Sequence, residues 1–186
     1  MRPAFVTLSV LALLAGRPDA AENDTEVKRQ AAEDLTIAVT APRDPKDHHL
    51  QVAFHNSGRE DLLLNLGIML ANGKKQFATA IQLEVTDSKG VMRQFRPQGP
   101  NIAGRVDDLI VPLCAGASYA LRLNLDRCWS DDPQDPKVGI PRGDCRVAAL
   151  FEGRAAAHIS ADSQAGRLME LWAGRAKSKE VKVTME

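Results

Sequence analysis

Apolar residues alternate with polar or small residues in eight separate runs of this chain. A period of two places every second side chain on the same face of an extended strand, so each run predicts a half-buried strand. The runs are Leu35 to Val39, Leu50 to Phe54, Leu62 to Leu66, Ile81 to Val85, Leu109 to Leu113, Tyr119 to Leu123, Val147 to Phe151 and Val181 to Met185. Short strands at this spacing predict an all-β domain of two packed sheets.

The composition of the turns and of the polar strand faces favours antiparallel pairing. Residues that tolerate tight-turn geometry separate several of the runs, at Asn56-Ser57-Gly58, Asn72-Gly73, Asp87-Ser88-Lys89-Gly90 and Ala115-Gly116. Polar residues such as Gln51, Glu84 and Lys182 occupy the opposite strand face, which is therefore in contact with water. A parallel sheet covered by helices would have continuous apolar strands instead. We predict an immunoglobulin-like antiparallel β-sandwich of about eight strands.

The first twenty residues predict an export signal that is cleaved from the chain. Arg2 provides a positive charge, and the residues from Phe5 to Ala15 form an unbroken run of apolar and small side chains. Pro18 and Asp19 end this run short of the roughly 20 apolar residues that a membrane-spanning helix needs. The pattern predicts a signal peptide over residues 1–20, a secreted or periplasmic protein, and no membrane span after signal removal. The alternative is a buried helix or strand of a cytosolic protein.

Residues 21–33 are polar and predict a leader, and residues 34–186 predict the sandwich domain. The mature length of about 165 residues is within the range of one domain and allows burial of roughly 70% of the unfolded chain's surface. The 24 basic and 24 acidic residues balance. Basic residues are scattered along the chain, which argues against a nucleic-acid partner.

The cysteines predict one disulfide bond. Cys128 and Cys145 flank a loop rich in proline, aspartate and glycine, where a bridge would constrain a segment with little core of its own. In an oxidising compartment, a bridge closing such a loop stabilises the fold by about 3 kcal/mol in the chain-entropy model. Cys114 is then left over, either as a half-buried free thiol or as the site of an intermolecular bridge.

Two segments without alternation carry the two tryptophans. The segment from Asp126 to Asp144 contains three prolines and predicts a long loop. Trp129, Asp131, Asp132 and Asp135 in this loop are the candidate recognition residues. The spacing of the acidic residues differs from that of the twelve-residue calcium loop, so the sequence favours a solvated loop over a metal site. The segment 155–174 predicts a short helical turn that packs Trp172 into the core.

The sequence contains no motif that predicts catalysis or a cofactor. It lacks a Gly-x-Ser-x-Gly elbow, a His-Glu-x-x-His pair, a P-loop and a Gly-x-Gly-x-x-Gly turn. His48 and His49 are adjacent, so on a strand they would point to opposite faces, and His55 and His158 lie elsewhere in the chain. Surface histidines are therefore expected, with no metal, no cofactor and no catalytic residue.

The order of the motifs resembles known bacterial sandwich domains. The alternating strand Leu50 to Phe54 is followed by Asn-x-Gly, the segment from Leu83 to Gly90 has the form of a mid-domain hairpin, and a Gly-containing turn leads into the strand Tyr119 to Leu123. This order is similar to that of secreted immunoglobulin-like and fibronectin-like proteins of unknown function. It also resembles the sandwich family that includes an intracellular proteinase inhibitor of bacilli. The resemblance implies the fold over most of the mature chain.

Together these features predict an exported, non-enzymatic module that binds another extracytoplasmic protein or an envelope component through loops or edges. One alternative is a secreted protease inhibitor that inserts an exposed loop, such as Asp131 to Arg142, into a protease cleft. Another alternative is a small hydrolase with an unrecognised site, because catalytic triads assemble from distant positions of a chain.

Overall fold

The computed structural model describes residues 34–70, 73, 75–99, 101, 104–132, 138–153 and 171–186. The predicted signal peptide (1–20) and leader (21–33) lie outside these residues. The elements are β1 (Leu35–Thr40), β2 (His49–Asn56), β3 (Leu62–Leu70), β4 (Gln76–Phe77), β5 (Ile81–Thr86), β6 (Met92–Pro97), β7 (Val106–Leu113), β8 (Ser118–Asn124), the short 3-10 helix η1 (Leu125–Arg127), β9 (Cys128–Ser130), β10 (Gly143–Glu152), β11 (Arg175–Lys177) and β12 (Val181–Met185). All of the strand pairs are antiparallel.

Every predicted run is a strand, so the all-β prediction is confirmed. The alternation appears directly in the burial of side chains, as in β1 and β5, where every second residue is buried. The strands β4, β6, β9 and β11 were not predicted. Of these, β4, β9 and β11 have only two or three residues, too few to alternate, and β6 buries Phe95 alone.

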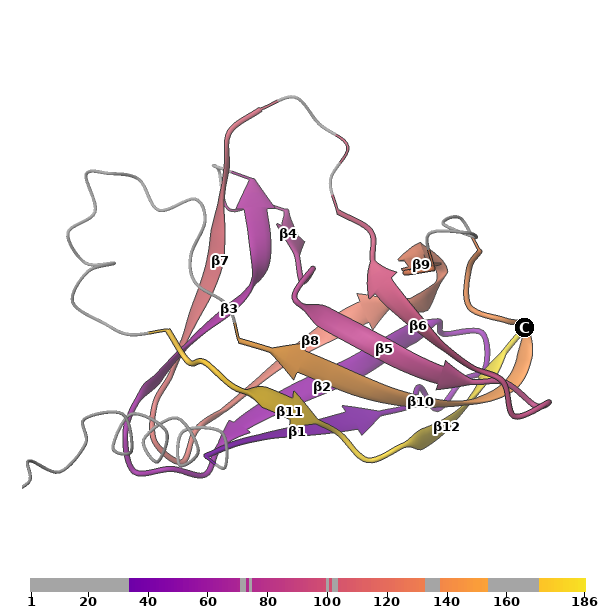
Figure 1. Cartoon of the computed structure of the whole chain (residues 1–186), viewed down its shortest axis with the longest axis horizontal. Coiled ribbons are helices and arrows are strands. Elements are labelled where there is room, and N and C mark those ends of the chain that lie inside the picture. Colours follow the sequence, from indigo (N-terminus) through magenta and orange to yellow (C-terminus); the bar gives the residue numbers. More distant parts are fainter. Residues whose placement is uncertain are drawn as a thin grey trace, which may run out of the picture.

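Two sheets pack face to face around the core. One has the order β1-β2-β8, and the other has the order β11-β10-β5-β6-β9, with β12 also pairing with β10. Figure 1 shows the strands of both sheets running in similar directions across the molecule. Three aromatic rings lie at the centre of the core. The ring centroids of Phe54 and Phe151 are 5.3 Å apart in an edge-to-face arrangement, and those of Phe151 and Trp172 are 5.4 Å apart in a stacked arrangement. The predicted core position of Trp172 is confirmed, since the residue is 4% exposed.

A further sheet, in the order β4-β3-β7, stands upright beside the sandwich (Figure 1). The β3–β7 register shifts between Asn65 and Gly67, which indicates a β-bulge. Gly67 has a φ of 149°, and a Cβ at this position would lie 2.1 Å from the Phe77 carbonyl oxygen. Glycine is therefore required where β3 passes close to the backbone of β4.

A fully buried amide fixes the end of β2. The Asn56 side chain donates from Nδ2 to the carbonyl oxygens of Glu60, at 2.8 Å, and Leu113, at 3.0 Å. Its Oδ1 accepts from the backbone N–H of Gly58 at 3.0 Å. One side chain thus satisfies groups from the β2–β3 turn and from β7, which explains why a polar residue has 0% exposure here.

The prediction that Asp126 to Asp144 is one long loop is wrong at both ends of the segment. Its first residues belong to η1 and β9, and β9 pairs with β6 from Cys128 to Ser130. At the other end, β10 begins at Gly143. The prolines that led to the loop prediction include Pro133 and Pro136, which lie outside the described residues, as does most of the helical turn predicted over 155–174.

The predicted disulfide between Cys128 and Cys145 is also wrong, because all three thiols are free. Cys128 lies on β9 and Cys145 on β10, and β5 and β6 separate the two strands. Three strand spacings amount to about 14 Å along the sheet, whereas a disulfide needs Cα atoms within about 7 Å. Each buried thiol instead donates to a backbone carbonyl oxygen at 3.5 Å, that of Asn124 for Cys128 and that of Val183 for Cys145.

The burial of these thiols predicts their reactivity. Burial, reinforced by Asp126, raises the pKa of the Cys128 thiol from 9.0 to about 12, and burial beside Asp144 also raises the pKa of Cys145. Cys114 is exposed. At pH 8 we expect a chromogenic disulfide reagent to modify Cys114 rapidly and the other two thiols only after unfolding. All three thiols should react in denaturant. If only one thiol reacts there, Cys128 and Cys145 are bonded to each other and the assignment of free thiols is wrong.

The same pKa shift predicts how stability depends on alkaline pH. A thiol whose pKa is higher in the folded state contributes stability that is complete below its unfolded pKa and is lost as pH rises through the folded value. For Cys128 this window extends from pH 9 to about 12. We expect Cys128→Ala to flatten the fall of the urea midpoint across this window, and an unchanged slope would contradict the assignment.

Candidate functional site

The predicted recognition residues that are described lie along the outer edge of the larger sheet. Trp129, on β9, is partly buried, and its Nε1 is buried without a hydrogen-bond partner. The side chain of Asp131 accepts from Arg96 Nε at 2.7 Å and from Gln82 Nε2 at 3.2 Å. The backbone N–H of Asp132 donates to Ser130 Oγ. Asp135 lies outside the described residues, and the recognition role of all four remains a prediction.

The described histidines bind separate partners. His48 Nδ1 lies 2.7 Å from Asp126 Oδ2, His49 Nδ1 lies 2.8 Å from Asp47 Oδ1, and His55 Nδ1 lies 3.0 Å from Ser118 Oγ. His158 lies outside the described residues. In the part of the chain that the structure describes, no group of three His, Cys, Asp or Glu side chains is arranged to hold a metal ion.

Four exposed or half-exposed side chains from neighbouring strands form one line across the larger sheet. Met92 on β6 pairs with Thr86 on β5, Thr86 pairs with Arg146 on β10, and Arg146 pairs with Lys182 on β12. Residues directly opposite one another in a sheet share a face. This is the outer face, because the neighbouring residues Val85, Val147 and Val183 point into the core. We call Met92, Thr86, Arg146 and Lys182 the cross-strand row.

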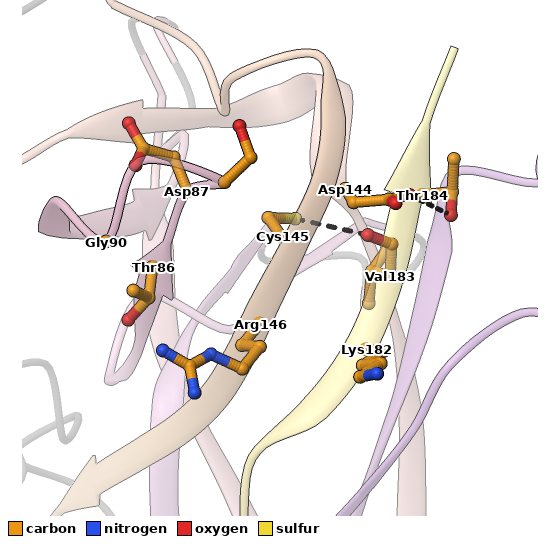
Figure 2. A pocket seen from close by; sticks show the side chains of 10 residues that line it. Thr86, Asp87, Gly90, Asp144, Cys145, Arg146, Lys182, Val183 and Thr184 are labelled. Atoms are coloured by element: carbon orange, nitrogen blue, oxygen red, sulfur yellow. Dashed lines mark hydrogen bonds between the residues drawn. The ribbon is translucent and has the colours of Figure 1, made fainter.

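A pocket of about 420 Å³ adjoins the row at the end of the sandwich where the β5–β6 turn lies. Its walls are the turn residues Asp87, Ser88 and Gly90, the start of β10 and the end of β12. Figure 2 shows Arg146 extending from β10 toward the side of Thr86, while Lys182 lies on β12. The pocket thus combines hydroxyl, carboxylate and cationic groups.

The acidic groups of the pocket are already engaged by neighbouring atoms. Asp87 Oδ1 accepts from the backbone N–H groups of Lys89 and Val91, both at 2.9 Å, and closes the β5–β6 turn. Asp144 Oδ1 accepts from Thr184 Oγ1 at 2.8 Å, as Figure 2 shows. These carboxylates are therefore satisfied without using the cations of the row.

The cations of the row are less well satisfied. Arg146 Nε lies 3.6 Å from Glu180 Oε2, and both side chains are about half exposed, so this ion pair contributes little. Lys182 makes no ion pair with any described residue. Like charges directly opposite each other on adjacent strands repel. The Arg146 and Lys182 pair is therefore a place where an incoming anion would relieve repulsion.

The main chain at the start of β10 is also open toward the pocket. The backbone N–H of Ser178 donates to the Ala149 carbonyl at 2.9 Å, so odd-numbered residues of β10 direct their main-chain groups away from β5. Even-numbered residues then face β5, whose pairing with β10 ends at Arg146 and Thr86. The main-chain groups of Asp144 consequently face the pocket with no strand opposite them.

Two exposed apolar residues lie at the edge of this surface. Within the described residues, the large apolar side chains that are exposed are Val91, at 45%, and Met92, at 55%. Both follow the β5–β6 turn, next to the pocket. The turn was predicted from the sequence, but the site was not. The relevant sequence signal is the presence of two consecutive apolar residues, Val91 and Met92, directly after Gly90.

Residues 34–70, 73, 75–99, 101, 104–132, 138–153 and 171–186 contain no helix with the length and apolar character to cross a membrane. No protein-family model matches this chain, and no curated protein matches its sequence.

Proposed function

We propose that this chain is an exported, non-enzymatic module that binds another extracytoplasmic protein through the end of its sandwich that carries the β5–β6 turn. The observation that carries the proposal is the exposure of Val91 and Met92 beside a charged pocket. The two residues are consecutive, so their side chains extend to opposite sides of the strand and expose apolar groups on both sides of the β5–β6 turn. Exposed apolar side chains on a polar surface are typical of interaction sites. Methionine and arginine are both enriched in protein interfaces.

The strand order supports an immunoglobulin-like assignment within the all-β fold. In immunoglobulin domains, strands A, B and E lie in one sheet, and strands C, F and G lie in the other. Here β1-β2-β8 matches the first set in chain order, while β5, β10 and β12 match the second. On this assignment β5 is the C strand. The sheet β4-β3-β7 is then formed by two insertions, β3 and β4 before β5 and β7 after β6. Domains of this kind commonly bind partners through loops and edges.

The N-terminal sequence supports the proposal of export. A positive residue followed by a short apolar run and a region of small residues is the pattern of a secretory signal. An envelope or secreted location would provide the extracytoplasmic partner. Secretion of the full chain with loss of about twenty residues, measured by intact mass of the mature protein, tests this part.

A capture experiment with matched variants tests the binding surface. The purified protein is immobilised and exposed to envelope extract and culture fluid, and the retained proteins are identified by mass spectrometry. We expect one partner whose retention falls at least tenfold in the double variant Val91→Ser and Met92→Ser, because truncating an interface hot spot costs about 2 kcal/mol or more and each 1.4 kcal/mol is about tenfold in affinity. Both residues are exposed, so the fold should be unaffected.

The control is Arg59→Ser, which changes an exposed residue of the β2–β3 turn at the opposite end of the sandwich. It should retain the partner as the wild type does. Equal loss in both variants, or equal retention in both, would place the binding surface elsewhere and contradict the proposal.

A further inference from the structure

We infer that the partner presents an extended polypeptide segment to the cross-strand row, with a carboxylate over Arg146 and Lys182 and an apolar side chain about three residues away over Met92. This inference rests on the proposed function and specifies the chemistry of the partner. It follows from the order of side chains along the row, which begins with an exposed apolar group and ends with two cations.

The cationic end fits a single carboxylate. Arg146 and Lys182 lie directly opposite each other, so one anion can contact both. An arginine guanidinium also matches a carboxylate in a bidentate geometry. The neighbouring acids Asp87, Asp144 and Glu180 keep the total local charge low. Because these three acids outnumber the two cations, the surface as a whole does not attract a polyanion such as nucleic acid or an anionic membrane. The anion that fits the Arg146 and Lys182 pair is a single acidic side chain.

The spacing along the row fits an extended chain. Met92 is two strands away from Arg146, which is about 10 Å across the sheet. An extended segment in the polyproline II conformation rises about 3.1 Å per residue with three residues per turn, so side chains three residues apart lie on the same side and about 9 Å from each other. Between the two ends lies Thr86, whose hydroxyl can bond to a main-chain group of the segment. The free main-chain groups of Asp144 offer a further hydrogen bond at the pocket end.

The probe for this inference is a fluorescein-labelled synthetic peptide that has a leucine followed three residues later by a glutamate, with alanine and serine elsewhere. We expect fluorescence anisotropy to show saturable binding to the wild-type protein. Replacing the glutamate of the peptide with glutamine should weaken binding about tenfold, because the charge-assisted contact to Arg146 and Lys182 is lost. Equal binding of both peptides would overturn the inference.

The protein variants assign the contact to the row. The double variant Arg146→Gln and Lys182→Gln should bind the acidic peptide about tenfold more weakly and should no longer distinguish it from the glutamine peptide. The control is Arg175→Gln with Lys179→Gln, which removes the same charge from exposed positions on and beside β11 of the same sheet. The control should bind like the wild type. Urea midpoints of all variants confirm that they are folded.

Two outcomes separate this inference from the proposed function. In the first outcome, Val91→Ser with Met92→Ser abolishes partner capture while Arg146→Gln with Lys182→Gln leaves capture unchanged. The proposed binding surface would then be supported, and the inference of an acidic partner segment would be overturned. Binding to phosphatidylglycerol vesicles that depends on Arg146 and Lys182, without binding to the peptide, would also overturn it in favour of a membrane surface.

Discussion

Replacing Asn56 with aspartate should lower the free energy of unfolding by about 4 kcal/mol at neutral pH, measured by urea denaturation. The Asn56 amide donates to the carbonyl oxygens of Glu60 and Leu113 in a site with no solvent exposure. A carboxylate there would place negative charge against two carbonyl oxygens and leave both without a donor. The cost combines desolvation of a charge with the loss of two buried hydrogen bonds.

The pH dependence of this variant identifies the cause. A carboxyl group in this site titrates with a raised pKa, because burial and the carbonyl oxygens both disfavour its charged form. Stability relative to wild type should therefore be partly recovered as pH falls and the group becomes protonated. Asn56→Ala should cost less than the aspartate variant at neutral pH and should lack this recovery. A surface substitution in the same turn, Arg59→Ser, should change stability by less than about 0.5 kcal/mol.

Truncating the ring at the centre of the sandwich is the second large effect. Phe151→Ala should cost about 3 to 5 kcal/mol, because it opens a cavity between the two sheets. The ring is fully buried, meets Phe54 edge to face at 5.3 Å and stacks on Trp172 at 5.4 Å. Loss of those aromatic contacts adds to the lost burial.

Near-ultraviolet circular dichroism of Trp172 provides the second measurement for this variant. Its aromatic signal should decrease with Phe151→Ala even where the protein is still folded, because Trp172 loses its stacked neighbour. Phe151→Leu keeps most of the volume and should cost less than the alanine variant. If both variants lower the free energy of unfolding by less than about 1 kcal/mol, the Phe151 ring does not contribute substantially to the packing between the two sheets.

The strands could be predicted because their signal is local. In β1 and β5 each residue's burial follows from its place in an alternating run, and these runs are visible without knowing any partner strand. The same reasoning fails for β6, where exposed Met92 and Arg93 break the pattern and Phe95 is the one buried residue. That strand is specified by pairing with β5 and β9 rather than by its own sequence.

The candidate site could not be predicted because it depends on register. Thr86, Arg146 and Lys182 are far apart in sequence and become neighbours only when three strands align at particular positions. A shift of one residue in either pairing of β10 would place Arg146 and its partner residue on opposite faces of the sheet. The disulfide prediction failed for the same reason, because the spacing of Cys128 and Cys145 in sequence says nothing about the two strands that separate them.

The position of β10 inside the larger sheet, between β5 and the pair β11 and β12, has a consequence for how the chain folds during synthesis. β10 pairs with β5, which comes much earlier in the sequence, and with β11 and β12, which follow it. Until β10 has been made, β5 lacks its partner on one edge and the core between the sheets stays open. Contacts of such long sequence separation form slowly. A growing chain therefore keeps one edge of β5 and its apolar face available to a chaperone from the synthesis of β5 until that of β10.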